Sequence, residues 1–150
     1  MVLAELRNRN IKNYKCRHFN LENDFSEFGN FDLIINFGLI YHLKNVEKNL
    51  NCCAKMSDEI LLESNVCDSN DPSKIIYVNH PDGISQSVGG VGSRCSPSYI
   101  ERIFENNNFN VIRCWSKDLN SEPYVYDWEH NNDDSLDGKK RLFWNFKRRK

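Results

Sequence analysis

The segment FDLIINFGLIYHLKN, residues 31–45, is the strongest structural signal in this chain. Its apolar run at 31–37, interrupted by Asp32, is rich in Ile and Leu and too short to form an independent helix. Such a run predicts a strand that is buried on both faces. Gly38 ends the run, and because glycine lacks a Cβ it allows a turn that other residues resist.

Two hydrogen-bonding side chains, Tyr41 and His42, follow just past the carboxyl end of this predicted strand. In open α/β sheets the ligand crevice lies outside the carboxyl ends of the strands. The pattern therefore offers a phenol and an imidazole as candidate ligand contacts. The same residue types equally allow a structural interpretation, in which both residues begin the next helix and cap the sheet.

Length and charge limit the kinds of protein that this chain can be. Its 150 residues suit one domain with a real core. The 20 basic and 21 acidic residues imply no strongly charged partner, and we interpret the basic tail 147–150 as a solvated end rather than a nucleic-acid-binding arm. No apolar run is long enough to span a membrane, and the charged N-terminus does not have the pattern of a signal peptide.

Six cysteines are distributed along the chain without a CxxC pair: Cys16, Cys52, Cys53, Cys67, Cys95 and Cys114. Without a secretory signal, this usage favours reduced thiols in a cytoplasmic protein. We predict no metal site, because only residues distant in the sequence could converge to form one.

The remaining segments predict alternating helices and strands. Helices are expected at 1–9, at 45–56 with Asn45 as N-cap, and at 97–107 with Ser96 as N-cap and Pro97 at the first helical position. Strands are expected at 14–20, 59–66, 74–79, 109–115 and 141–146. This alternation predicts an α/β domain with a largely parallel sheet.

The region 67–95 is the least regular part of the sequence and contains two prolines. A connection of this length is usually functional or mobile. Its run Gly89-Gly90-Val91-Gly92 lacks the Lys-Ser/Thr pair of a phosphate-binding loop, so we interpret it as a flexible lid.

Three segments carry a resemblance to a known family: residues 31–45 with the helix that follows, EILLESNV at 59–66, and SPSYIERIFENNNFNVIRCW at 96–115. Together they resemble the C-terminal part of a class I S-adenosylmethionine-dependent methyltransferase, over most of residues 14–147. The resemblance implies a single partial domain at 1–150 with a Rossmann-like sheet and helices on both faces. It also implies S-adenosyl-L-methionine as methyl donor and an unidentified small-molecule or RNA acceptor.

The resemblance assigns the donor to two segments of this chain. Asn36, Phe37 and Gly38, at the end of the family's fourth strand, would face the methyl donor. Asn20 and Leu21 would lie near the adenine, where the family often has an acidic residue; an asparagine keeps the hydrogen bond to the adenine amino group and removes the charge.

The acceptor side is assigned in the same way. His42 would act as a base or orient the acceptor, since the pKa of an unperturbed histidine lies near neutrality, and Tyr41 would shape the pocket. Glu63 and Arg94 are candidate substrate contacts. Glu63 is alternatively a plain acid on the helix side, and Arg94 is equally expected to be solvated.

Parts of the family pattern have no counterpart in this sequence. They are the first strand with its Gly-rich turn, and the acidic residue that ends the second strand. If residues 2–9 match the helix before the family's third strand, the domain is N-terminally truncated and its first two strands are missing. In the family's strand order, 3-2-1-4-5-7-6, a strand at 14–20 would then have no neighbour, so we expect it to reposition, to pair with another chain or to stay loosely held.

Two functional hypotheses follow from this pattern. The chain is a methyltransferase, or the C-terminal portion of one, which receives the missing elements from a companion chain or a longer form. Alternatively, it is a non-catalytic methyltransferase-like remnant or partner subunit that completes another chain or forms a homodimer through its incomplete sheet. A third interpretation is an α/β domain whose resemblance carries no function.

Overall fold

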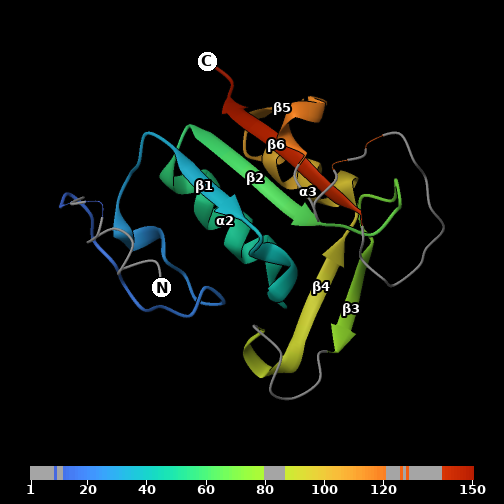
Figure 1. Cartoon of the computed structure of the whole chain (residues 1–150), viewed down its shortest axis with the longest axis horizontal. Helices are drawn as coiled ribbons and strands as arrows, with labels where there is room; N and C mark the ends of the chain where they lie inside the picture. Colours follow the sequence, from blue (N-terminus) through green and yellow to red (C-terminus); the bar gives the residue numbers. More distant parts are fainter. Residues whose placement is uncertain (1–8, 10–11, 80–86, 121–125, 127, 129–139) are drawn as a thin grey trace.

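A four-stranded sheet is the centre of the computed structural model, which describes residues 9, 12–79, 87–120, 126, 128 and 140–150 (Figure 1). Its strands lie in the order β1-β2-β6-β5: β1 is Ile34–Phe37, β2 is Glu59–Asn65, β6 is Arg141–Arg148 and β5 is Phe109–Arg113. This order matches the 4-5-7-6 portion of the order that the resemblance implies, so the prediction of a Rossmann-like α/β fold is confirmed.

The prediction of a largely parallel sheet is wrong. Only β1 and β2 run parallel, and β6 runs antiparallel to both of its neighbours, β2 and β5. β5 ends at the same edge of the sheet at which β6 begins, since Arg113 lies opposite Trp144. Strand β6 therefore runs back along β5 in the opposite direction.

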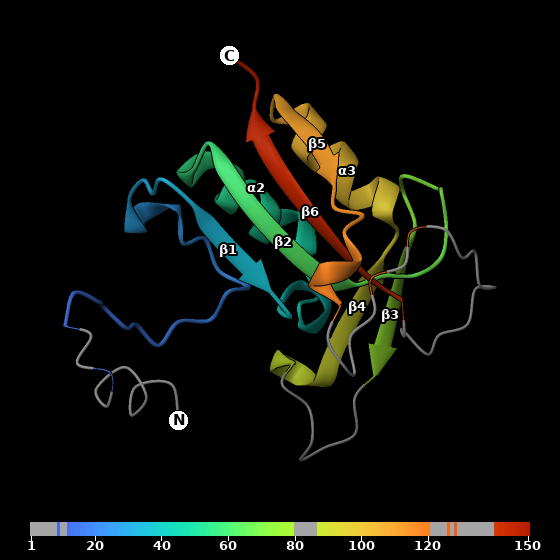
Figure 2. The ribbon, with the colours of Figure 1, turned by 45° about the horizontal axis from the view of Figure 1, so that its top comes forward.

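Both described helices, α2 (Val46–Met56) and α3 (Pro97–Asn106), cover the same face of the sheet (Figure 2). The strand residues under them form the core and are fully buried: Ile60, Leu62, Leu142, Trp144 and Phe146. The expectation of helices on both faces is therefore wrong for the described residues. We call the other side of the sheet the open face.

The open face explains why the predicted strand at 31–37 differs from the observed one. Strand β1 begins only at Ile34, and Ile35 and Phe37 are 61% and 47% exposed, so the strand is not buried on both faces. An apolar run shows that a strand suits a buried position, but only the neighbouring elements determine whether both of its faces are covered.

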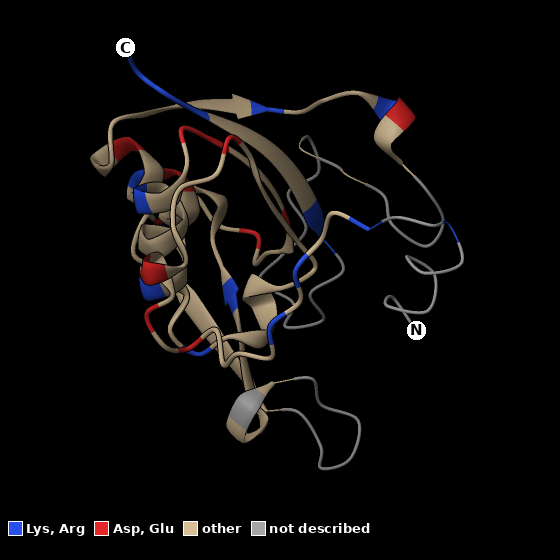
Figure 3. Ribbon diagram, turned by 90° about the vertical axis from the view of Figure 1, so that its left-hand side faces the viewer, with Lys and Arg blue, Asp and Glu red and all other residues tan. Residues whose placement is uncertain are grey.

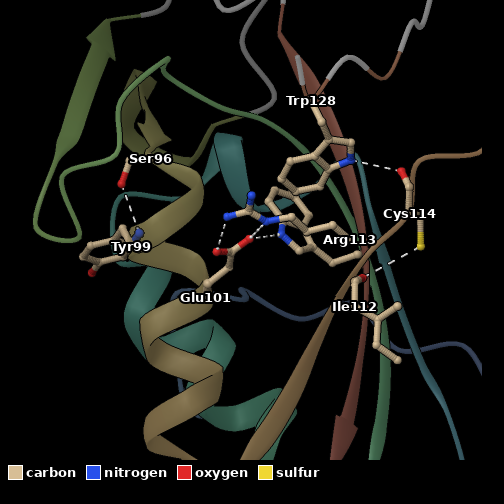
Figure 4. A network of polar contacts seen from close by, with 8 residues as sticks. Ser96, Tyr99, Glu101, Ile112, Arg113, Cys114 and Trp128 are labelled. Atoms are coloured by element: carbon tan, nitrogen blue, oxygen red, sulfur yellow. Dashed lines mark hydrogen bonds and ion pairs between the residues drawn. The ribbon is translucent and has the colours of Figure 1, made fainter. Parts of the chain in front are cut away.

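Local sequence signals place both helices correctly. The Asn45 side chain accepts a hydrogen bond from the backbone N–H of Lys48 at 3.2 Å, as predicted for an N-cap. The Ser96 side chain does the same for Tyr99 at 3.0 Å (Figure 4), and its hydroxyl also donates to the carbonyl of Asp71 at 2.6 Å.

Replacing Ser96 with Ala is expected to lower the free energy of unfolding by about 1–2 kcal/mol, because the fully buried cap loses its hydrogen bonds. Urea denaturation measures this change. Ser98→Ala is the matched control in the same helix, since no side-chain hydrogen bond of Ser98 is found among the described residues, and it should change stability by no more than about 0.5 kcal/mol. Equal effects of the two substitutions would contradict the capping role.

A second, two-stranded sheet occupies the region that was predicted to be irregular. Strand β3, Ile75–Asn79, confirms the short strand expected there, and it pairs antiparallel with β4, Val91–Cys95. The lid interpretation is wrong for Val91 and Gly92, which belong to β4. Strand β4 is held in place by tertiary contacts such as the hydrogen bond from the Ser93 hydroxyl to the carbonyl of Leu43 at 2.8 Å.

The strand predicted at 14–20 is not formed. This segment carries no strand or helix, although Phe19 packs against the core and its ring lies 4.9 Å from that of Phe28. Alternating side chains make a strand only where a neighbour completes the backbone hydrogen bonds. The helix predicted at 1–9 lies outside the described residues except for Arg9, which is in a turn.

Charged residues of both signs are interspersed over the described chain (Figure 3). The basic tail is largely exposed, as predicted: Lys147, Arg149 and Lys150 are exposed, and Arg148, in strand β6, is half-buried. Arg148 donates hydrogen bonds to the carbonyls of Ala54 and Asn107, near the C-terminal ends of the two helices. The described residues contain no helix long and apolar enough to cross a membrane and no metal-binding group of His, Cys, Asp or Glu, and none of the six cysteines forms a disulfide.

Candidate functional site

Gly38 turns the chain at the carboxyl end of β1. Its φ of +61° lies in the left-handed region, and its backbone N–H donates to the Glu63 carboxylate at 2.9 Å. A Cβ at this position would lie 3.7 Å from the Tyr41 hydroxyl and 3.9 Å from the same carboxylate. The turn therefore brings the end of β1, the next 3₁₀ turn (Ile40–His42) and the end of β2 together.

Two arginines from distant parts of the chain lie against Tyr41. The guanidinium carbons of Arg94 and Arg141 lie 5.1 Å and 5.2 Å from the centre of its ring. Arg141 donates to the Tyr41 hydroxyl at 3.1 Å, and Arg94 donates to the Tyr41 carbonyl at 3.1 Å. His42 is half-buried beside it, with ring centres 4.2 Å apart.

A buried ion pair completes this group. Arg141 and Glu63 lie 2.6 Å apart, with side chains that are 13% and 6% exposed. Burial lowers the pKa of Arg141, but its hydrogen bonds with Glu63 and Tyr41 outweigh this and raise the pKa above the ordinary arginine value. We call Gly38, Tyr41, Glu63, Arg94 and Arg141 the Tyr41 cluster.

The structure thus brings four of the predicted site residues together: Gly38, Tyr41, His42 and Glu63, with Arg94 as a fifth at the same place. Glu63 is not a plain helix-side acid, because it lies on the open face and pairs with Arg141. Arg94 is not solvated, since it is only 9% exposed. Its burial, with the nearby positive charge of Arg141, lowers the pKa of Arg94.

The predicted donor residues lie on two sides of the sheet. Phe37 lies on the open face, with its ring 5.1 Å from that of Phe143. The Asn36 side chain is buried beneath helix α2, where it donates to the Asn49 side chain at 3.1 Å. The Asn36 side chain therefore links the end of β1 to helix α2 on the helix-covered face of the sheet and does not project onto the open face.

Leu21 is connected to the end of β1 through Asn49. The Asn49 amide accepts from Asn36 and donates to the carbonyl of Leu21 at 3.5 Å. Leu21 also lines a cavity of about 440 Å³ with mainly aromatic and basic neighbours: Lys15, Arg17, Phe19, Phe28 and Phe31. The Asn20 side chain is exposed and accepts from the backbone N–H of Glu22 at 3.0 Å.

Two residues of this region were missed in the sequence. Asn49 sits in the buried stripe of α2, between Val46 and Leu50, so its position at helical spacing was a signal that could have identified it. Arg141 gave no such signal, because its partner Glu63 lies 78 positions earlier in the chain.

Comparison with known proteins gives structural neighbours only. No family model and no curated protein matches this sequence. The chain is similar to the N-terminal domain of EvdMO1 with SAH bound (15% identity, TM-score 0.69) and to the same domain in the presence of SAH and D-fucose (17% identity, TM-score 0.68). These matches cover 98% of this chain but only 59% and 60% of the EvdMO1 domain.

A third structure is more distant. It is an S-adenosylmethionine-dependent methyltransferase from Clostridium acetobutylicum ATCC 824, with 11% identity, a TM-score of 0.53, and coverage of 97% of this chain and 69% of that one. At sequence identities this low, the structural similarity shows a shared fold and nothing more. Together with the strand order, they show that this chain has the fold of the class I S-adenosylmethionine-dependent methyltransferases.

Proposed function

We propose that this chain takes part in methyl transfer from S-adenosylmethionine to an acceptor. The observation that carries the proposal is the Tyr41 cluster, which lies at the carboxyl ends of β1 and β2 in a methyltransferase-like sheet. In open α/β sheets, ligands bind at the carboxyl ends of the strands. Bound there, S-adenosylmethionine would supply an activated methyl group, which would pass directly to the acceptor as the carbon–sulfur bond breaks and S-adenosylhomocysteine leaves.

The described residues fit part of this donor. The cavity beside Leu21 has aromatic walls that suit an adenine ring, and the exposed Asn20 amide, next in the sequence to Leu21, can bond an adenine amino group. Phe37 offers an apolar surface on the open face near Gly38. The parts of the family pattern that hold the methionine portion and the ribose hydroxyls have no counterpart in this sequence.

The chain's own residues would mainly position the reactants. Gly38 leaves the end of β1 without a side chain, and Tyr41, fixed by Arg141, would form a wall of the acceptor pocket. His42, next to Tyr41, is our candidate for the base that accepts a proton from the acceptor or orients it.

Calorimetric titration of the 150-residue chain with S-adenosylmethionine and S-adenosylhomocysteine tests this proposal. We expect saturable binding that is lost in Gly38→Val, where a branched side chain would meet an unfavourable φ beside Tyr41. Gly29→Val controls for backbone strain, since Gly29 also has a positive φ but a Cβ there would meet no atom within 4 Å. No binding at millimolar ligand by the folded chain would overturn independent donor binding.

One observation favours the alternative, a non-catalytic partner subunit. Strand β1 is at the edge of the described sheet, and large apolar side chains on and before it are exposed: Phe31, Leu33, Ile35 and Phe37. An exposed apolar edge strand is a template for pairing with another chain. Light scattering would show a homodimer, or a complex with a companion chain, as a mass above that of the monomer. Ile35→Lys should return the mass to that of the monomer.

A further inference from the structure

Arg94 carries a buried positive charge for which the described residues supply no carboxylate partner. One of its terminal nitrogens, Nη1, donates to the carbonyls of Tyr41 and Ser93 at 3.1 Å and 2.9 Å. Its Nε is buried and makes no hydrogen bond within the described part of the chain. Burying a guanidinium without an anion is costly, so this arrangement indicates a site for an anionic ligand.

Glu63, the one acid of the Tyr41 cluster, already accepts hydrogen bonds at both of its carboxylate oxygens. One Glu63 oxygen accepts from Arg141 and the other accepts from the backbone N–H of Gly38. Arg94 and Arg141 both lie over the ring of Tyr41, with their guanidinium carbons 5.1 Å and 5.2 Å from its centre. Among the described residues, the Tyr41 cluster contains two guanidinium groups and one carboxylate.

We propose that Arg94, together with Arg141, binds an oxyanion group of a small-molecule methyl acceptor, either a carboxylate or a phosphate, beside Tyr41. This inference rests on the proposed function, which places the methyl donor next to Gly38. A Cβ on Gly38 would touch the Tyr41 hydroxyl, so an anion held by these arginines would lie close to the donor. Guanidinium groups suit this role, because their donors match the geometry of carboxylate and phosphate oxygens.

Anion binding can be measured without any methyl donor. We expect the Arg94 Nε–H resonance, assigned by its loss in Arg94→Lys, to shift saturably when phosphate or acetate is added to the ¹⁵N-labelled chain. Arg102 is the internal control, because its Nε is also buried without a hydrogen bond in the described structure, and its guanidinium also lies over a tyrosine ring, Tyr99, at 5.2 Å. An unmoved Arg94 resonance, or equal shifts of both arginines, would overturn the oxyanion site.

Matched variants provide a second readout. Phosphate should raise the melting temperature of the wild-type chain and of Arg102→Gln, and Arg94→Gln should weaken phosphate binding by about tenfold or more. If Arg94→Gln does not fold, the wild-type resonance still decides the question. Phosphate stabilisation that is unchanged in a folded Arg94→Gln variant would contradict the proposal.

The oxyanion could also be the carboxylate of the donor itself. S-adenosylhomocysteine carries that carboxylate and 5′-methylthioadenosine does not, so the two ligands separate the sources. We expect Arg94→Gln to bind S-adenosylhomocysteine as tightly as the wild type. Weaker binding of S-adenosylhomocysteine alone would assign the anion to the donor and overturn its assignment to the acceptor.

Two further outcomes distinguish this inference from the proposed function. Anion binding in a folded chain that binds no donor would overturn independent donor binding and leave the oxyanion site in place. Binding of a short RNA oligonucleotide that depends on Arg94 and is tighter than that of phosphate would overturn the small-molecule assignment. Basic and acidic residues are interspersed along the described chain (Figure 3), which favours the small molecule.

Discussion

Replacing Glu63 with Ala is expected to lower the free energy of unfolding by about 3–5 kcal/mol, because it removes one partner of a buried ion pair. The Arg141 guanidinium would keep its charge in a place where its side chain is only 13% exposed. The backbone N–H of Gly38 would also lose the Glu63 carboxylate oxygen at 2.9 Å. Urea denaturation of the wild type and of Glu63→Ala measures the loss. We expect a lower midpoint in the variant and the same slope of unfolding free energy against urea concentration in both proteins.

Strand β2 supplies a matched control for this prediction. Glu59 lies on the same strand and pairs with Lys147 at 3.1 Å, but the two side chains are 37% and 50% exposed. Water screens such a pair, so Glu59→Ala should change stability far less than Glu63→Ala. Similar effects of the two substitutions would show that the Glu63–Arg141 pair is not desolvated in solution.

The second large effect is expected for Trp144→Ala, which should lower the free energy of unfolding by about 3–5 kcal/mol. Trp144 lies at the centre of the core with no exposed surface, and its ring packs edge-on against Trp128 at 5.1 Å. Its indole N–H donates to Glu101 at 3.0 Å. Glu101 in turn binds Arg113 through both carboxylate oxygens (Figure 4). Truncation leaves a cavity that these neighbours can fill only in part.

Two further substitutions separate the contributions to this loss. Trp144→Phe keeps most of the packing and removes the indole hydrogen bond, so it should cost about 1 kcal/mol, since Arg113 still satisfies both oxygens of Glu101. Trp115→Ala, at a position that is 57% exposed, should change stability by no more than about 0.5 kcal/mol. A cost of Trp144→Ala as small as that of Trp115→Ala would contradict the central position of Trp144 in the core.

Features that depend on neighbouring residues were predictable from the sequence. Asn45 and Ser96 cap their helices through hydrogen bonds that reach three residues along the chain, so the pattern that predicts them is local. Residues 31–37 were correctly predicted to contain a strand, and Gly38 to turn the chain after it. The same local pattern predicted that Tyr41 and His42 lie at the carboxyl end of β1.

Features that depend on coverage by other elements were not predictable. The apolar run before Gly38 could not show that one face of β1 is open, and the alternation at 14–20 could not supply the neighbour that a strand needs. The sequence VGSRC at 91–95 has no strand-like apolar pattern, yet it forms β4, because pairing with β3 and the Ser93–Leu43 hydrogen bond hold it there.

The candidate site shows the same division. The sequence alone determined the types of its local residues, Gly38, Tyr41 and His42, because a strand end and a glycine turn are encoded within a few positions. Only the tertiary structure decided that Arg94 is buried and that Arg141, 78 positions after Glu63, becomes the partner of that carboxylate. The physical reason is that desolvation and charge pairing depend on distances in space, which local sequence patterns do not determine.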